Sequence, residues 1–327
     1  MSFLYSEHDG DLNVLNSQTI SIIGYGNLGK PAAHNLRDSG IRLIVSGTDA
    51  EQNEAHEDGF TVGSIAHAVR QSDIIVLMLP DEIMTQIYMT GISPNLRRGH
   101  TLIFSSAYNI SFGFIEPPPF VDVALIAPRT VGDTLRESFT EEKSIMSYVA
   151  VWQDASRHAW EIVLATARAL GALKGGALEV SVQQEAELSL FIQQAILPAF
   201  HNIILTAARL LMQEGYPAEA VLTDLYLSGK FTDYIQQAAR SGLMPTLQLS
   251  GETGQYGTFS RMDRFNELKL ERLMEVTLED IRNGNFAREW SREQADGKPR
   301  FNKLKKLQEA QDLWEIEQQT LEMREQL

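Results

Sequence analysis

A glycine-rich turn near the start of the chain has the residue types and spacing of a phosphate-binding site. Its six residues are Gly24, Tyr25, Gly26, Asn27, Leu28 and Gly29. The apolar run 19–24 leads into it and an amphipathic segment ending at Asp38 follows, which is the strand–turn–helix context of a dinucleotide site. There Gly24 permits the tight turn, Gly26 lets a pyrophosphate approach the backbone, and Gly29 lets the helix pack on the strand. We predict that phosphates bind the free N–H groups at this helix end; the alternative is a glycine turn without a ligand.

A second polar group follows the next apolar run, at residues 41–45. It contains Ser46, Thr48 and Asp49, and Asp49 lies 25 residues after Gly24. At about this spacing a carboxylate accepts hydrogen bonds from the adenosine ribose, so Asp49 is the expected ribose ligand, with Glu51 in reserve. Asp49 could instead cap the following helix.

The same region bears on the choice between NADH and NADPH. No Lys or Arg occurs between Leu43 and Val69. A 2′-phosphate normally needs a cation, so the sequence favours NADH. NADPH is the alternative, because the hydroxyls of Ser46 and Thr48 could hydrogen-bond a phosphate.

These site residues require a scaffold, and the first half of the chain predicts an α/β one. Apolar strand-like runs alternate with helix-like segments. The predicted strands are residues 19–24, 41–45, 73–79, 101–105, 121–127 and 147–151, and helices are expected up to Asp38 and at 64–71. Strands separated by helices predict a Rossmann-type parallel sheet with helices on both faces.

The pattern becomes purely helical after residue 182. Helices are expected at residues 185–215, 218–227, 231–241 and 264–283, the last capped by Gly284, with an amphipathic tail from Asn302. The first has apolar residues around most of its circumference, which is typical of a helix buried on nearly every side. We therefore expect two domains, a dinucleotide-binding domain at 1–182 and an all-α substrate and dimerisation domain at 183–327.

Composition excludes several classes of protein. The net charge of −15 disfavours nucleic acid and anionic membranes as partners, and a chain with no cysteine has no disulfide, thiolate metal site or cysteine nucleophile. The first residues lack the basic and apolar regions of a signal peptide. No apolar run approaches the roughly 20 residues of a membrane span. A cytoplasmic protein with a small-molecule substrate is expected.

Several segments, in order along the chain, resemble the short form of ketol-acid reductoisomerase. They are residues 24–29, 35–40, 79–82, 94–96, 109–113, 127–129, 286–290 and 299–302. The resemblance implies a Rossmann domain followed by a knotted helical domain. It also implies that Leu79, Pro80 and Asp81 contact the cofactor. Family members pair through the helical domains, and both chains contribute to each active site. A homodimer or a larger even-numbered homo-oligomer is therefore expected.

The resemblance breaks down at the metal site. Family enzymes use two Mg²⁺ ions to move an alkyl group, and hard Mg²⁺ requires oxygen ligands, chiefly carboxylates. The positions that match the four family carboxylates are Ser189, Gln193, Thr223 and Leu227. We expect no Mg²⁺ and no metal site here.

Other catalytic positions also differ from the family pattern. Ser106 stands at the family histidine and Arg129 at the family lysine, while Ser250 matches a family serine only if one residue is inserted. Arg129 would bind a substrate carboxylate, since a guanidinium remains charged but is a poor proton donor. Ser106, Ser250 or Tyr256 would hydrogen-bond the reacting group.

Three functions fit these residues. The first is a metal-independent NAD(P)H-dependent reductase of a ketone or imine in a small metabolite, with specialised metabolism as one setting. The second is a noncatalytic dinucleotide-binding regulatory or scaffold protein. The third is a Mg²⁺-dependent ketol-acid reductoisomerase of branched-chain amino acid synthesis. The lost carboxylates favour the first.

Overall fold

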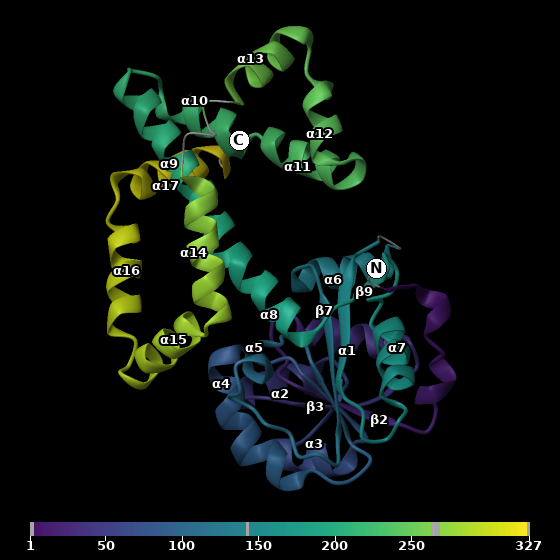
Figure 1. Ribbon diagram of the computed structural model, residues 1–327. Coiled ribbons are helices and arrows are strands. Elements are labelled where there is room, and N and C mark those ends of the chain that lie inside the picture. The colour runs from purple at the N-terminus through teal and green to yellow at the C-terminus, as the bar shows by residue number, and fades with distance from the viewer. Residues whose placement is uncertain (1–2, 142–143, 263, 265–268, 326–327) are drawn as a thin grey trace. The chain divides into compact units, whose positions relative to one another are not determined.

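Two units make up the chain, residues Met1–Leu188 and Ser189–Leu327. The computed structural model describes residues 3–141, 144–262, 264 and 269–325. Figure 1 shows a sheet covered by helices in the first unit and helices alone in the second. This confirms the expected fold class, a Rossmann-type domain followed by an all-α domain.

The sheet of the first unit has nine strands in the order β1-β9-β8-β7-β6-β5-β2-β3-β4 among the residues described. Their bounds are β1 Leu4–Tyr5, β2 Thr19–Ile23, β3 Arg42–Ser46, β4 Thr61–Val62, β5 Ile74–Leu77, β6 Thr101–Phe104, β7 Asp122–Pro128, β8 Ser147–Gln153 and β9 Ala177–Glu179. Strands β2 to β7 pair in parallel, whereas β8 is antiparallel to β7 and β1 to β9. All six predicted strands are present.

Successive residues of the central strands enter two different cores, because side chains alternate between the faces of a sheet. Ile20, Ile22 and Val76 belong to the core on one face, and Ile75 and Leu77 to the core on the other. Burial on both faces explains why these strands are apolar throughout rather than alternating.

Helices cover both faces of this sheet (Figure 1). They are α1 Gly29–Asp38, α2 Asp49–Glu57, α3 Ile65–Gln71, α4 Asp81–Ile87, α5 Tyr108–Ser111, α6 Gly132–Thr140 and α7 Ala159–Ala169. Residues of α1, α2, α6 and α7 enter the first core, and residues of α3, α4 and α5 enter the second. Four predicted site residues lie at or just after the carboxyl ends of parallel strands, at one edge of the sheet. They are Ser46 at the end of β3, Asp81 after β5, Ser106 after β6 and Arg129 after β7.

The second unit is helical throughout its described residues. Its helices, with α8 leading into it, are α8 Val182–Phe191, α9 Leu197–Gln213, α10 Ala218–Leu222, α11 Lys230–Ser241, α12 Leu243–Thr246, α13 Glu252–Met262, α14 Leu270–Arg282, α15 Asn285–Ala295, α16 Pro299–Glu309 and α17 Asp312–Glu325. The predicted stop of α14 is confirmed, since Gly284 follows it with φ 67°. Of the helix expected at 264–283, residues 265–268 lie outside the described part. A small core of Ala208, Val221 and Leu222 joins α9 to α10, with Leu313 and Ile316 of α17 packed against it.

The long apolar helix, Val182–Gln213, is largely exposed within the described single chain, so burial within one subunit does not account for its apolar circumference. Only 11% of its most apolar window of 18 residues is buried, and Ile203 and Leu197 are 58% and 54% exposed. By length and composition this helix could cross a membrane, which corrects the statement that no segment approaches a span. Exposed apolar surface of this kind often marks an interaction site.

Two turns of the second unit are π-helical, Ile192–Ile196 and Thr223–Leu227. They contain Gln193, Thr223 and Leu227, three of the four positions at which the family resemblance places metal ligands. A π turn inserts an extra residue into the helical repeat and is frequent at functional sites.

Candidate active site

The glycine turn joins β2 to α1 through contacts that no side chain could enter. Gly24 has φ +100°, and its N–H donates to the Ser46 carbonyl at 2.7 Å. A Cβ on Gly29 would lie 1.9 Å from the Gly24 carbonyl oxygen, and one on Gly24 would lie 2.5 Å from the Met78 carbonyl oxygen. Because of these contacts, the start of α1 packs directly against the carboxyl end of β2.

Gly26 is different, because the protein leaves space beside it. A Cβ there would meet only Glu51 Oε1, at 3.7 Å. Together with Asn27 and Lys30, Gly26 lines a hollow of about 630 Å³ next to the start of α1. The room at Gly26 fits the approach of a pyrophosphate that the sequence predicts.

The other residues of the turn hold its shape. Tyr25 is buried, and its hydroxyl donates to Asp58 at 2.7 Å. The Asn27 carbonyl packs so closely on Gly132 that a Cβ on Gly132 would lie 1.6 Å from its oxygen. Leu28 packs partly buried against the first core.

Glu51 is a carboxylate that accepts a hydrogen bond from the backbone of the glycine turn. Its Oε1 accepts from the Tyr25 N–H at 3.0 Å, and its Oε2 accepts from the Thr48 N–H at 2.7 Å and the Thr48 hydroxyl at 2.9 Å. Asp49, the first choice from the sequence, is exposed in the first turn of α2. Glu51, the third residue of α2, reaches back to the N-cap Thr48 in a capping box, which brings its carboxylate to the turn. The role of Asp49 as ribose ligand stays a prediction.

Three further predicted cofactor residues, Ser46, Leu79 and Pro80, are positioned by the sheet and by the start of α4. Ser46 is fully buried, and its hydroxyl has no hydrogen-bond partner among the described residues. Leu79 is buried in the second core, and Pro80 is the N-cap of α4. The Ser46 hydroxyl is closed off from solvent, so its role as a cofactor contact stays a prediction.

Asp81 and Ser106 form a hydrogen-bonded pair between the ends of β5 and β6. The Ser106 hydroxyl lies 3.2 Å from Asp81 Oδ2, and the Tyr108 N–H donates to the same hydroxyl oxygen at 3.3 Å. Asn109 Nδ2 donates to the Asp81 carbonyl at 3.0 Å and to Asp81 Oδ1 at 3.3 Å. The sequence reasoning missed Asn109, although its motif at 109–113 was noted.

The surroundings of Asp81 favour its protonated form. Burial, the largest cause, together with the nearby carboxylates of Glu185 and Glu82, raises the pKa of Asp81 to about 6. Hydrogen bonds from Ser106 and Asn109 oppose this rise. A carboxyl group with such a pKa exchanges its proton near neutral pH.

Arg129, the predicted carboxylate clamp, is paired with Glu185 of α8. Its Nη1 lies 3.1 Å from Glu185 Oε1, and its guanidinium lies 4.9 Å from the centre of the Tyr148 ring. Glu185 is 97% buried in its side chain, and its Oε2 accepts from the Ala107 N–H at 2.9 Å. A substrate carboxylate would therefore share the guanidinium with Glu185, a partner that the sequence did not reveal.

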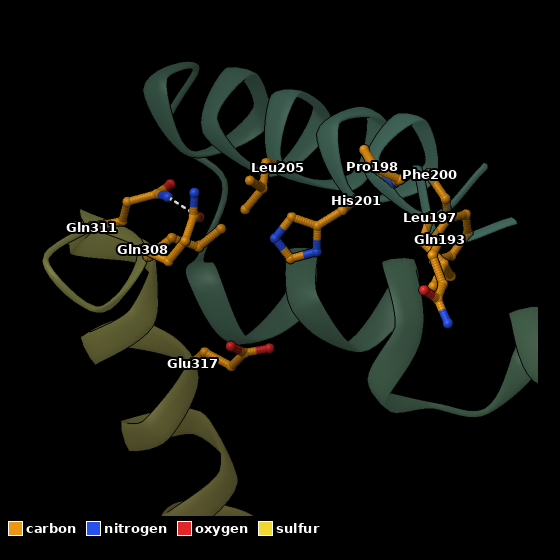
Figure 2. A pocket seen from close by; sticks show the side chains of 10 residues that line it. Gln193, Leu197, Pro198, Phe200, His201, Leu205, Gln308, Gln311 and Glu317 are labelled. Atoms are coloured by element: carbon orange, nitrogen blue, oxygen red, sulfur yellow. Dashed lines mark hydrogen bonds between the residues drawn. The ribbon is translucent and has the colours of Figure 1, made fainter. Parts of the chain in front are cut away.

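The remaining predicted residues belong to the second unit. Ser250 is exposed just before α13, and Tyr256 within α13 is 72% exposed. Gln193 lines a cavity of about 580 Å³, shown in Figure 2, into which His201 and Glu317 also point. No group of three His, Cys, Asp or Glu side chains in the described part of the chain could hold a metal ion. The roles of Ser250 and Tyr256 stay predictions.

We expect Gly26→Val to abolish NADH binding without unfolding the protein, because its added atoms enter space that the protein leaves open. Fluorescence titration should show at least a hundredfold weaker binding at an unchanged melting temperature. As a contrast, Gly29→Ala should lower the melting temperature, since its Cβ overlaps backbone atoms. Equal NADH affinity of Gly26→Val and the parent would show that the cofactor does not cross this turn.

Two family models match consecutive parts of the chain. "Acetohydroxy acid isomeroreductase, NADPH-binding domain" matches residues 14–176, and "Ketol-acid reductoisomerase, C-terminal domain" matches residues 182–326. The second model begins at the first residue of α8.

Full-length relatives agree with the family models. Proteins named ketol-acid reductoisomerase (NADP(+)) from Clostridioides difficile and Methanopyrus kandleri are 33% and 35% identical over 309 residues, covering 93% of either chain. A solved NADH-preferring ketol-acid reductoisomerase from an uncultured archean has a TM-score of 0.92 and 28% identity, with 99% of both chains covered. Both domains and the whole length match, so the chain belongs to the ketol-acid reductoisomerase family and is an NAD(P)H-dependent oxidoreductase.

Proposed function

We propose that this protein reduces the C=O or C=N bond of a small, carboxylate-bearing metabolite without a metal ion. One observation carries the proposal. The glycine turn and the hydrogen-bonding groups at the sheet edge are intact, whereas Ser189, Gln193, Thr223 and Leu227 occupy the family's metal-ligand positions. The nicotinamide supplies a hydride when bound, and the chain has to orient the acceptor and give it a proton.

The residues at the metal positions do not fit Mg²⁺. Neutral Ser, Gln and Thr oxygens bind this ion weakly, and Leu227 offers no ligand atom. Asp224 lies within the same π turn, but its side chain is 82% exposed and lies 3.7 Å from Lys230 Nζ. Glu185 is engaged by Arg129, which places a positive charge one helical turn before Ser189 on α8. We therefore derive no metal-dependent step.

Arg129 and Ser106 are the expected contacts of the substrate. Both follow parallel strands at the edge where open α/β sheets bind their ligands. The guanidinium offers further donors to a carboxylate besides the one held by Glu185. Ser106 would hydrogen-bond the carbonyl oxygen or the imine nitrogen. Such positioning of the acceptor is what hydride transfer chiefly requires of a protein.

The relatives' names favour a second candidate, a Mg²⁺-dependent ketol-acid reductoisomerase. The same names give no support to a role in specialised metabolism, which we do not propose. They also disfavour a noncatalytic scaffold. The metal-independent reductase and the ketol-acid reductoisomerase differ in one measurable property, which is the need for a divalent ion.

The first test is metal dependence. We expect 2-acetolactate to be left unconverted, and NADH oxidation with a small 2-keto acid or a cyclic imine to be equal with and without EDTA. Alkyl migration develops charge on two neighbouring oxygens that only divalent ions would hold, whereas hydride transfer does not need them. Absorbance at the NADH band follows both reactions. Magnesium-dependent conversion of acetolactate would overturn the proposal in favour of the second candidate.

We further propose that NADH is the preferred cofactor. Glu51 places a carboxylate against the glycine turn and Thr48, where a 2′-phosphate would be repelled. Lys30, a nearby cation, is held by Glu54 at 2.6 Å and Asp58 at 3.0 Å. The similar archaeal structure is described as NADH-preferring, while the family model and the curated relatives name NADPH or NADP(+). The carboxylate of Glu51 supports NADH, because it acts on the 2′-phosphate, the one group in which the two cofactors differ.

Glu51→Ala should shift the ratio of NADPH to NADH affinity at least tenfold towards NADPH, about 1.4 kcal/mol. Removing the carboxylate removes its repulsion of the 2′-phosphate. Glu57→Ala, at an exposed position of the same helix, is the matched control and should leave the ratio unchanged. Tighter binding of NADPH than NADH by the parent would contradict the proposed preference.

We also propose that the protein is a cytoplasmic homodimer, or a larger even-numbered assembly, joined through the helical unit. The exposed apolar surface of Val182–Gln213 supports this, because burying it against a second copy removes it from water. A membrane is the other apolar environment, but the strongly acidic chain does not favour an anionic lipid surface.

Light scattering should give a mass of at least twice 36.6 kDa. Ile203→Glu should lower that mass or weaken the assembly at least tenfold, since Ile203 is 58% exposed in the described single chain. Met89→Glu is the control, because Met89 is 60% exposed but lies in the Rossmann unit. A parent protein that stays monomeric would refute the homodimer.

A further inference from the structure

The proposed reduction needs a proton as well as a hydride. Two electrons and a hydrogen reach the carbon of the C=O or C=N bond from the nicotinamide, and the oxygen or nitrogen must then receive a proton. A serine hydroxyl is too weak an acid to remain as an alkoxide after it has given up its proton. If Ser106 contacts the substrate, another group has to replace its proton within the same step.

The hydrogen bonds around Ser106 depend on the protonation of Asp81. With Asp81 ionised, the carboxylate can only accept, so the Ser106 hydroxyl donates to Oδ2 over 3.2 Å. With Asp81 protonated at Oδ2, the carboxyl group donates to Ser106 instead. The Tyr108 N–H already donates to that hydroxyl oxygen at 3.3 Å. Both lone pairs of Ser106 are then used, and its single proton is left for a third group.

Asn109 determines which oxygen of Asp81 carries the proton. The Thr85 hydroxyl donates to Asn109 Oδ1 at 2.9 Å, which turns the amide NH₂ towards Asp81. Asn109 Nδ2 donates to Asp81 Oδ1 at 3.3 Å. Because Oδ1 is held as an acceptor, a proton on this carboxyl group belongs on Oδ2, the oxygen that faces Ser106.

The charged and titratable groups facing Asp81 are mostly acidic. Glu82 follows it on α4, Glu185 approaches from α8, and the Tyr108 phenol from α5 has its own pKa raised to about 12, first by burial and then by Asp81. Arg129 is engaged by Glu185. Burial together with two nearby carboxylates keeps the proton on Asp81 up to a pH of about 6.

We propose that Ser106 is the catalytic proton donor of this enzyme. Asp81 is a positioning residue that returns a proton to the Ser106 hydroxyl. The O–H bond of Ser106 breaks as its proton moves to the substrate oxygen or nitrogen, and the Asp81 Oδ2 proton moves to Ser106 Oγ. Asp81 is left as a carboxylate and takes a proton from solvent before the next turnover. The proposal rests on the reductase function above, and it names the proton path that this function requires.

The first experiment measures NADH oxidation with a small 2-keto acid, 3-hydroxy-3-methyl-2-oxobutanoate, between pH 5 and 9. The parent kcat should fall as pH rises through the pKa of Asp81, because only the protonated carboxyl group returns a proton to Ser106. Asp81→Asn should lower kcat by about a hundredfold and remove this pH dependence. Ser106→Ala should have a similar effect, and the double variant should be no slower than the slower single variant, since both act on one path.

Glu82→Gln is the matched control, being an exposed carboxylate on the same helix. Its kcat should stay within twofold of the parent, with the pH profile moved slightly to lower pH because one neighbouring negative charge is gone. An Asp81→Asn variant that keeps the parent's pH profile would overturn the proton path while leaving the reductase function standing.

A second readout does not depend on turnover. Infrared difference spectra of the cofactor-free protein, recorded along a pH titration, should contain a carboxyl band that titrates near pH 6 in the parent. The band should be absent in Asp81→Asn and shifted in Ser106→Ala. If no acceptor is reduced by any variant, the reductase function fails, and the infrared titration alone then decides whether Asp81 holds its proton towards Ser106. A parent spectrum without this band would overturn the proposal.

Discussion

The contact between Gly29 and Gly24 is the constraint on which the rest of the site depends. The start of α1 lies so close to the end of β2 that a Cβ on Gly29 would come within 1.9 Å of the Gly24 carbonyl oxygen. This approach brings the positive end of α1 to the edge of the sheet, where a dinucleotide phosphate can reach the backbone.

The groups along that edge separate into two kinds of chemistry. At the ribose end, Glu51 presents a negative charge to the turn and Ser46 keeps a buried hydroxyl without a partner among the described residues. At the other end, Asp81, Ser106 and Asn109 form a hydrogen-bonded network, and Glu185 is paired with Arg129. In our proposal the first end selects the cofactor and the second end takes part in the reduction of a polar double bond.

The helical unit has a different physical character. Its described core is small, with Ala208, Val221 and Leu222 at the centre, while apolar residues of Val182–Gln213 face outwards. Such a surface costs free energy in water at about 25 cal/mol per Å² until a second surface covers it. Both π turns of the unit, Ile192–Ile196 and Thr223–Leu227, coincide with positions where the family has metal carboxylates.

The sequence by itself determined the fold class, the six main strands and the glycine turn, because burial on both faces and the strand–turn–helix order leave local signals. It also determined that Ser189, Gln193, Thr223 and Leu227 lack metal-binding carboxylates, since ligand chemistry is a property of residue type. Tertiary structure alone decided that the Glu51 carboxylate accepts from the Tyr25 N–H. This contact depends on how the first turn of α2 folds back onto its N-cap, Thr48. It likewise brought Asp81 to Ser106 and Glu185 to Arg129, pairs separated by 25 and 56 residues. Such pairs leave no periodic or local trace in a single sequence, because the order of the strands and the position of α8 place them side by side.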